Sequence, residues 1–107
     1  PVLLVFYLGH GCLHCLDQLN ALAPVAGAFQ SAGIDILAIS ADSPEALQKT
    51  QAQAKAGGGF PFPLVADPAR EVFRQYRVFD GFENLPLHGV FLVDGAGLVR
   101  WQDISFE

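Results

Sequence analysis

Apolar runs alternate with stretches of helical periodicity along the first third of the chain. Val2–Leu8 is a continuous apolar run whose length and Val and aromatic content are typical of a strand buried on both faces. A helical stretch follows from Cys12 and ends at Gly33. Pro24 removes a backbone donor inside it, so we expect that helix to kink or divide there. Ile34–Ser40 then predicts a second buried strand.

The remainder of the chain predicts two more helices and a hairpin. Ser43 and Pro44 are typical of a helix start, and the glycines at 57–59 are expected to end that helix. The other predicted elements are an extended segment Phe60–Val65, a helix capped by Asp67-Pro68 and running to about Tyr76, a loop Asp80–Leu87, and strands Gly89–Asp94 and Leu98–Ile104 joined by a turn at 95–97.

This order of elements predicts an α/β fold. Right-handed crossovers place the first two strands parallel in the middle of one sheet, and the hairpin adds an antiparallel pair at one side. We therefore expect a central mixed sheet with helices on both faces and a C-terminal β-hairpin.

Composition narrows the function classes. With 107 residues, 51% of them hydrophobic and 16% charged, the chain is expected to form a single domain over residues 1–107. Its net charge is -5, and its six Lys and Arg residues form no cluster, which argues against nucleic acid or an anionic membrane surface as a partner. No apolar run approaches the roughly 20 residues of a membrane span.

The ends of the sequence suggest a fragment. The chain begins with Pro1 and contains no Met, so we expect it to be a domain excised from a longer protein, with terminal elements missing. We expect a further helix beyond Glu107, with Trp101 packed under it.

The candidate chemistry is a C-x-x-C pair, Cys12 and Cys15, at the start of the first helix. The unpaired N–H groups of a helix N-terminus favour a thiolate, which is the reactive form. The spacing puts the two Cβ atoms about 5–6 Å apart, close enough for a disulfide. His14 lies between the cysteines and His10 precedes them, and either imidazolium could stabilise a thiolate. A redox-active disulfide, with no separate cofactor, is the expected centre.

Two other interpretations of these residues remain open. The cysteines could be buried and inert, or His10, Cys12, His14 and Cys15 could bind zinc, although a structural zinc site usually takes ligands from a second element. Covalent haem attachment is excluded because Leu16 stands where C-x-x-C-H needs histidine.

With these residues laid out, the chain resembles the thioredoxin-like superfamily and, within it, the peroxiredoxin-like AhpC/TSA (redoxin) branch. The resemblance covers nearly the whole chain. It is carried by Val2–Tyr7, Ile39–Ser43, Phe62–Pro68 and Phe91–Asp94 in this order. It implies a thioredoxin-like fold and thiol-based redox activity.

The resemblance assigns the cysteines in two ways. Peroxiredoxins have Phe-Tyr-Pro followed by Thr-x-x-Cys, so counting from Phe6-Tyr7 makes Cys15 the attacking residue and places Cys12 at the threonine position. In thioredoxins the first cysteine attacks, which here is Cys12. His88 stands where peroxiredoxins carry an arginine and thioredoxins a cis-proline, and this alignment places it in the active site.

We therefore carry three hypotheses. The first is dithiol–disulfide exchange with protein or small-molecule disulfides and thiols, in which Cys12 attacks and Cys15 resolves. The second is a thiol peroxidase acting on hydroperoxides, in which Cys15 attacks, Cys12 resolves, and an external reductant such as a thioredoxin restores the thiols. The third is a non-catalytic redox-sensing or metal-binding module. A buried Cys15 with an exposed Cys12 favours exchange, whereas an exposed Cys15 facing His88 favours the peroxidase.

Overall fold

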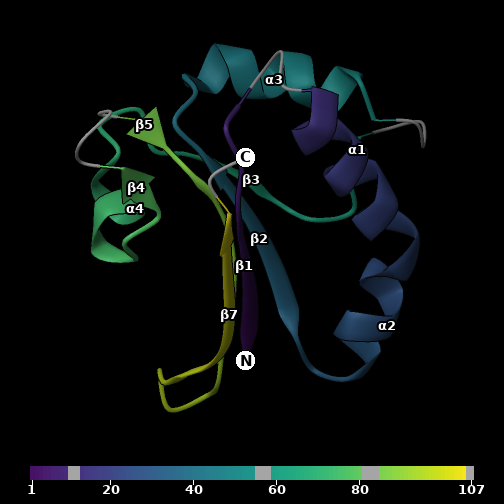
Figure 1. The fold of residues 1–107 in the computed structure, drawn as a ribbon. Coiled ribbons are helices and arrows are strands. Elements are labelled where there is room, and N and C mark those ends of the chain that lie inside the picture. The colour runs from purple at the N-terminus through teal and green to yellow at the C-terminus, as the bar shows by residue number, and fades with distance from the viewer. Residues whose placement is uncertain (10–12, 55–58, 81–84, 106–107) are drawn as a thin grey trace.

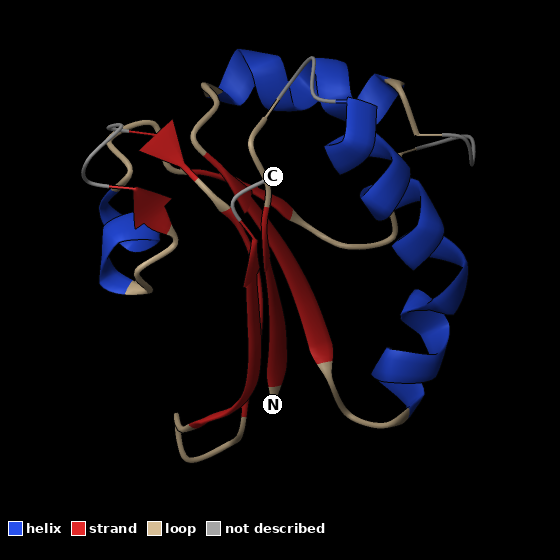
Figure 2. Ribbon diagram, viewed as in Figure 1, coloured by secondary structure: helices blue, strands red, loops and turns tan. Residues whose placement is uncertain are grey.

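A five-stranded mixed sheet forms the centre of the molecule (Figures 1 and 2). The computed structural model describes residues 1–9, 13–54, 59–80 and 85–105. The strand order is β3-β2-β1-β6-β7, in which β1, β2 and β3 are parallel and β6 and β7 are antiparallel to their neighbours. The strands are β1 (Val2–Phe6), β2 (Asp35–Ser40), β3 (Leu64–Ala66), β6 (His88–Val93) and β7 (Val99–Ser105). The predicted mixed sheet, with the hairpin at one side, is confirmed.

Proline divides the first helical segment as its chemistry requires. Helix α1 (Leu13–Leu22) leads into a 3₁₀ turn, η1 (Ala23–Val25), and then into helix α2 (Ala26–Ser31). Pro24 has no N–H to donate within this turn, so the helix loses its regular hydrogen bonding there. The predicted division at Pro24 is confirmed.

Helix α3 (Pro44–Ala52) begins as predicted and ends early. The Ser43 hydroxyl accepts the N–H of Ala46 at 3.3 Å, which caps the helix. The prediction that this helix runs to the glycines at 57–59 is wrong, because the helix ends at Ala52. The Gln51 side-chain oxygen accepts the N–H of Phe60 at 2.8 Å, so the chain has already left the helix and returned to its last turn.

The region after β3 holds a short helix and a ribbon. In α4 (Glu71–Gln75) the N–H groups of Glu71, Val72 and Phe73 donate to the Asp67 carboxylate at 2.9–3.2 Å, so Asp67 caps the helix. The helix begins later than predicted, at Glu71 and not directly after Asp67-Pro68. The predicted loop Asp80–Leu87 is corrected in part, since β4 (Phe79–Asp80) and β5 (Leu85–Pro86) pair within it. Strands of two residues are too short to show an alternation of apolar and polar positions in the sequence. The Leu87 N–H donates to the Val78 carbonyl at 2.7 Å and extends the pairing of β4 and β5.

Two buried clusters lie on opposite faces of the sheet. Helices α1, α2 and α3 lie on one side and α4 on the other (Figure 1). The residues of the first cluster include Leu3, Val5, Tyr7, Cys15, Leu19, Ala38 and Leu47, and those of the second include Leu4, Phe6, Ile39, Phe73, Val78 and Phe91. The predicted placement of helices on both faces is confirmed. Among the described helices, none has the length and apolar character to cross a membrane.

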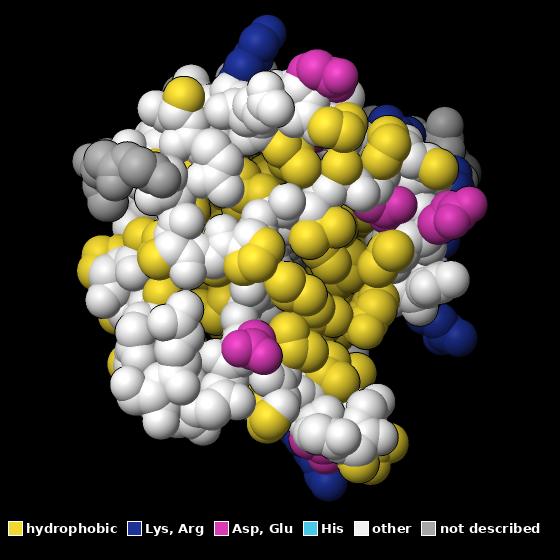
Figure 3. Space-filling model, turned by 180° about the vertical axis from the view of Figure 1, so that it is seen from behind, with side chains coloured by type: hydrophobic (Ala, Val, Ile, Leu, Met, Phe, Trp, Pro, Cys, Tyr) yellow, Lys and Arg dark blue, Asp and Glu magenta, His cyan; other side chains and the backbone are white. Residues whose placement is uncertain are grey.

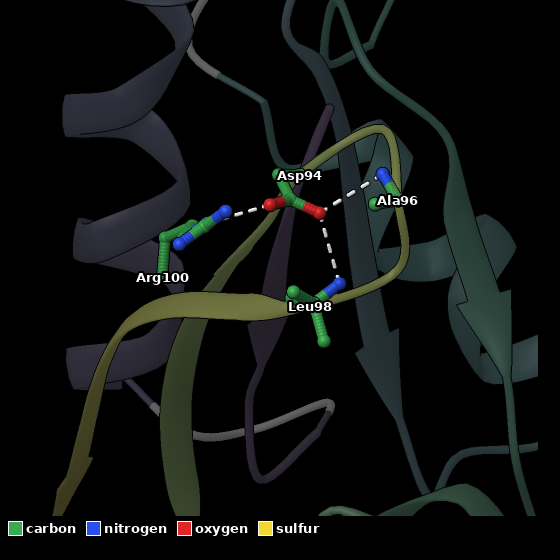
Figure 4. Close-up of polar contacts among 4 residues, drawn as sticks. All are labelled: Asp94, Ala96, Leu98 and Arg100. Carbon is green, nitrogen blue, oxygen red and sulfur yellow. Dashed lines mark hydrogen bonds and ion pairs between the residues drawn. The ribbon is translucent and has the colours of Figure 1, made fainter.

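The hairpin between β6 and β7 is held by one carboxylate (Figure 4). Asp94 accepts the N–H groups of Ala96 and Leu98, each at 2.9 Å, and pairs with the Arg100 guanidinium at 2.5 Å. The hydrogen bond from Leu98 and then the one from Arg100 hold the pKa of Asp94 below its usual value. This network fixes the turn predicted at 95–97.

Hydrophobic side chains gather over a broad part of the surface seen from behind (Figure 3). The large exposed apolar residues include Leu98, Val99 and Trp101, which lie on the hairpin and its outer strand β7. Trp101 is 54% exposed, so nothing in the described residues covers it, and its packing under a further segment stays a prediction.

Candidate active site

Cys15 lies buried at the first turn of α1, between two polar groups from other segments. Its side chain is 1% exposed and belongs to the core cluster on the α1 face of the sheet. The backbone N–H of Leu8 donates to the sulfur at 3.3 Å. The Nε2 atom of His88 lies 2.8 Å from the same sulfur. Two groups that can stabilise a negative charge therefore meet at this one atom.

Strand pairing explains why His88 reaches Cys15 across 73 positions of sequence. Strands β1 and β6 are antiparallel with Phe6 opposite Gly89. Phe6 belongs to the cluster on the α4 face, and a Cβ on Gly89 would point at Val78 of the same cluster. Side chains alternate between the faces of a sheet, so the next positions, Tyr7 and His88, point to the α1 face. The end of β1 thus supplies Tyr7, the start of β6 supplies His88, and α1 places Cys15 over both.

The Cys15–His88 contact has two protonation states. A thiol can donate to a neutral imidazole, or an imidazolium N–H can donate to a thiolate. Cys15 is the third residue of α1, where backbone N–H groups lack partners within the helix and the helix dipole favours negative charge. Both the dipole and the Leu8 N–H support the thiolate state, which is the nucleophilic form of cysteine.

Tyr7 is a site residue that the sequence analysis did not single out. It is 1% exposed, and its hydroxyl has no hydrogen-bond partner among the described residues. Burial raises the pKa of the Tyr7 phenol, and the charges of Asp42 and Cys15 raise it further. The nearby Ser40 hydroxyl lowers it, although its own proton is donated to Asp42. The phenol therefore stays neutral beside the sulfur. The sequence could have indicated this role of Tyr7, because side chains alternate between the two faces along a strand, which puts Leu3, Val5 and Tyr7 on one face.

A polar cluster after β2 supports the loop that enters the site. The Ser40 hydroxyl donates to the Asp42 carboxylate at 3.1 Å and accepts the Asp42 N–H at 3.2 Å. Gly9 has φ +131°, and a Cβ there would lie 2.7 Å from a carboxylate oxygen of Asp42. Only glycine fits this conformation and this approach, so the chain can pass close to Asp42 on its way towards α1.

The other predicted site residues lie partly outside the described residues. His10 and Cys12 are outside them, and so is the side chain of His14, whose backbone belongs to α1. The Cys12–Cys15 disulfide and the four-ligand zinc site therefore stay predictions. Within the described part of the chain, no group of three or more His, Cys, Asp and Glu side chains could hold a metal ion.

An open pocket of about 400 Å³ lies elsewhere, and its lining includes Val2 and Asp35, the first residues of β1 and β2. Cys15 and His88 lie at the opposite end of the sheet, beyond the carboxyl end of β1, which is the usual reaction site in open α/β sheets. The chemistry and the pocket are therefore separate features.

Comparison with known proteins decides the family. The model of the AhpC/TSA family matches residues 1–102. The chain belongs to the AhpC/TSA family. This confirms the resemblance drawn from the sequence, and it covers nearly the whole chain.

Individual relatives are peroxiredoxins. A peroxiredoxin 2 from Thermoplasma acidophilum is 32% identical over 102 residues, covering 94% of this chain and 51% of that protein. The crystal structure of Enterococcus faecalis AhpC superposes with a TM-score of 0.88 at 19% identity and covers 98% of this chain and 63% of that one. A Xanthomonas campestris bacterioferritin comigratory protein gives a TM-score of 0.84 at 21% identity, over 96% of this chain and 66% of that one. The chain therefore has the thioredoxin-like fold of peroxiredoxins and spans about half the length of the curated relatives it matches.

The structure meets only part of what each hypothesis, disulfide exchange or peroxide reduction, requires of the two cysteines. Cys15 is buried, as the exchange hypothesis expects, yet it faces His88, as the peroxidase hypothesis expects. Cys12, the other half of the exchange criterion, lies outside the described residues. Membership of the AhpC/TSA family favours the peroxidase hypothesis over exchange.

Proposed function

We propose that this AhpC/TSA domain reduces hydroperoxides with Cys15 as the attacking thiol. The observation that carries the proposal is the 2.8 Å contact between the Cys15 sulfur and Nε2 of His88. When His88 takes the proton of the thiol, the imidazolium at this distance holds the sulfur as a thiolate, and the Leu8 N–H adds a second donor. Thiolates attack the O–O bond of a hydroperoxide, so the site holds its nucleophile in the reactive form.

Cys15 is favoured over Cys12 by two lines of support. The count from Phe6-Tyr7 in the peroxiredoxin pattern ends at Cys15. The described contacts of a donor N–H and an imidazole also converge on the Cys15 sulfur. The order of roles proposed here is therefore the reverse of the first hypothesis, in which Cys12 attacks.

The small size of a hydroperoxide fits a sulfur that is 1% exposed. A protein disulfide is much larger, and direct attack on one by Cys15 would need an accessible sulfur, which Cys15 does not present. Similar proteins support this substrate class, since the solved Xanthomonas campestris protein is described by its alkyl peroxide reduction activity. An alkyl or hydrogen peroxide is accordingly the proposed substrate.

The catalytic cycle closes through the second cysteine. Attack by the Cys15 thiolate oxidises the sulfur to a sulfenic acid and releases an alcohol or water. The Cys12 thiol then condenses with the sulfenic acid, forms a disulfide and releases water, and an external dithiol reductant such as a thioredoxin restores both thiols. The redox-active disulfide is the only redox group that this cycle needs.

Single-turnover kinetics with hydrogen peroxide and with an alkyl hydroperoxide test the proposal. The variants are Cys12→Ser and Cys15→Ser, and sulfenic acid is trapped with a selective reagent. Because attack needs only the first thiol, Cys12→Ser should form sulfenic acid at the wild-type rate and Cys15→Ser should form none. A separate assay of disulfide exchange with a protein disulfide completes the comparison.

Other outcomes would support the other hypotheses. Loss of sulfenic acid in Cys12→Ser, with retention in Cys15→Ser, would assign the attack to Cys12. Rapid reduction of a protein disulfide with peroxide reactivity no better than that of free cysteine would favour dithiol exchange. Stoichiometric metal in protein purified without chelator, bound by wild type and lost in Cys12→Ser, would favour the metal-binding module.

A further inference from the structure

The peroxiredoxin pattern and this chain differ at the residue that touches the sulfur. Where the resemblance leads us to expect an arginine, the chain has His88, and its Nε2 lies 2.8 Å from the Cys15 sulfur. Arginine keeps its proton throughout the accessible pH range, whereas histidine gains and loses one near neutrality. Histidine in place of arginine thus alters the chemistry available at this position, because of the two side chains only histidine can pass on a proton.

We propose that His88 is a catalytic acid that carries the proton of the Cys15 thiol to the leaving oxygen of the hydroperoxide. This inference rests on the proposed function and adds a second catalytic residue to it. The same nitrogen that faces the sulfur serves in both steps, so the contact at 2.8 Å is the geometric basis of the transfer.

The step balances without an outside reactant. The thiol gives its proton to Nε2 of His88, leaving a thiolate and an imidazolium. The thiolate attacks the terminal oxygen of the hydroperoxide, so an S–O bond forms and the O–O bond breaks. The sulfur is oxidised to a sulfenic acid while the peroxide gains the two electrons. The departing alkoxide or hydroxide takes the Nε2 proton and leaves as an alcohol or water, and neutral His88 is restored.

Titratable groups on the described elements around this pair include Tyr7, Asp42 and Asp103. Tyr7, which directly follows β1, stays neutral because burial raises the pKa of its phenol. Asp42 follows β2 and acts on Tyr7 through its charge. Asp103 on β7 lies opposite Val90, the next residue on the His88 face of β6. A nearby carboxylate raises the proton affinity of both Cys15 and His88. Variants at position 88 that keep Asp42 and Asp103 therefore differ in reactivity only through the side chain at position 88.

The mechanism predicts a bell-shaped dependence of the peroxide rate on pH. At low pH the sulfur is a thiol beside an imidazolium, and at high pH it is a thiolate beside a neutral imidazole. The reactive state needs one proton shared between the two groups, and it exists only between these limits.

The experiment measures the second-order rate of sulfenic acid formation against pH for His88→Arg and His88→Gln. All proteins carry Cys12→Ser, so Cys15 is the only thiol, and its ionisation is followed separately by thiolate absorbance. His88→Arg should keep a low-pH thiolate and lose the alkaline decline. His88→Gln should shift the ionisation of Cys15 to higher pH and lower the neutral rate by about a hundredfold.

The outcomes separate this inference from the proposed function. An alkaline decline that persists unchanged in His88→Arg would overturn the role of His88 while leaving Cys15 as the attacking thiol. A thiolate titration of Cys15 that is the same with His, Arg and Gln at position 88 would overturn it as well. Peroxide reactivity no better than free cysteine in the parent protein would overturn the proposed function, and the proton transfer with it.

Discussion

Gly89 offers the sharpest test of how the sheet holds His88 against Cys15. It follows His88 in β6, lies opposite Phe6 of β1, and is buried. A Cβ built on Gly89 would overlap the Cγ1 methyl of Val78 and lie 3.2 Å from a ring carbon of Phe91. Val78 is 0% exposed and β-branched, so it has neither free space nor another ready rotamer. We therefore expect Gly89→Ala to displace the start of β6.

The magnitudes follow from packing. Overfilling a core by one methyl group costs about 1–3 kcal/mol, so Gly89→Ala should lower the free energy of unfolding by about 2 kcal/mol. Val78→Ala alone removes buried methyl groups and leaves a cavity, which costs about 2 kcal/mol. In the double variant the added methyl occupies the space vacated by Val78. The double variant should therefore lose at least about 1 kcal/mol less stability than the sum of the two single losses.

Urea unfolding followed by circular dichroism measures all four corners of this cycle. The slope of free energy against urea should stay constant, since the surface exposed on unfolding is unchanged. Gly27→Ala in α2 is the matched control, because a Cβ there meets nothing within 4 Å and alanine should stabilise the helix by about 0.5–1 kcal/mol. If the costs of Gly89→Ala and Val78→Ala simply add, the backbone absorbs the methyl group and the argument from Val78 is refuted.

Three further predictions concern single side chains. Asp67→Ala leaves three N–H groups of α4, of which that of Phe73 is buried, without their acceptor and should cost about 2 kcal/mol in urea unfolding. Asp67→Asn should cost less, and equal stability of wild type and Asp67→Ala would contradict the cap. The hydrogen bonds to Asp94 lower its pKa below the ordinary value of 3.8, so they contribute stability above that pH, and this stability is lost as the pH falls through the lower folded pKa. Asp94→Asn should therefore flatten the acid end of a plot of stability against pH, and an unchanged plot would refute this. Tyr7→Phe removes a buried hydroxyl without a partner among the described residues, so at pH 7 the thermal midpoint should not fall. Because the folded pKa of Tyr7 is raised, its contribution is present below its ordinary value of 10.0 and lost as the pH rises above it, and Tyr7→Phe should weaken this alkaline loss.

The sequence predicts those parts of the fold that are determined by residues close together along the chain. The buried strand within Val2–Leu8, the division at Pro24 and the Ser43 cap each depend on a few adjacent positions. The features it misses depend on contacts between distant segments. The early end of α3 goes with the Gln51–Phe60 hydrogen bond, and the short ribbon of β4 and β5 depends on pairing across a connection.

The candidate site divides in the same way. The helix start around Cys15 is local, and the motif predicts it. The place of His88 was inferred from the family pattern, and only the structure shows its nitrogen at the sulfur. Tyr7 was missed because a buried tyrosine in an apolar strand resembles any other core residue until its neighbours are known.

The register between β1 and β6 joins the packing of Gly89 to the chemistry of His88. A slip of one residue would turn every side chain of β6 to the other face of the sheet, carrying His88 away from Cys15 and toward α4. It would also bring a residue with a side chain against Val78, where only glycine fits. The contact that forbids a Cβ at Gly89 therefore selects the register in which His88 meets the sulfur. It follows that Gly89→Ala should slow the reaction of Cys15 with peroxide as well as lower stability, and that Val78→Ala should restore part of both. Recovery of stability without recovery of the peroxide rate would show that the register and the His88 contact are independent.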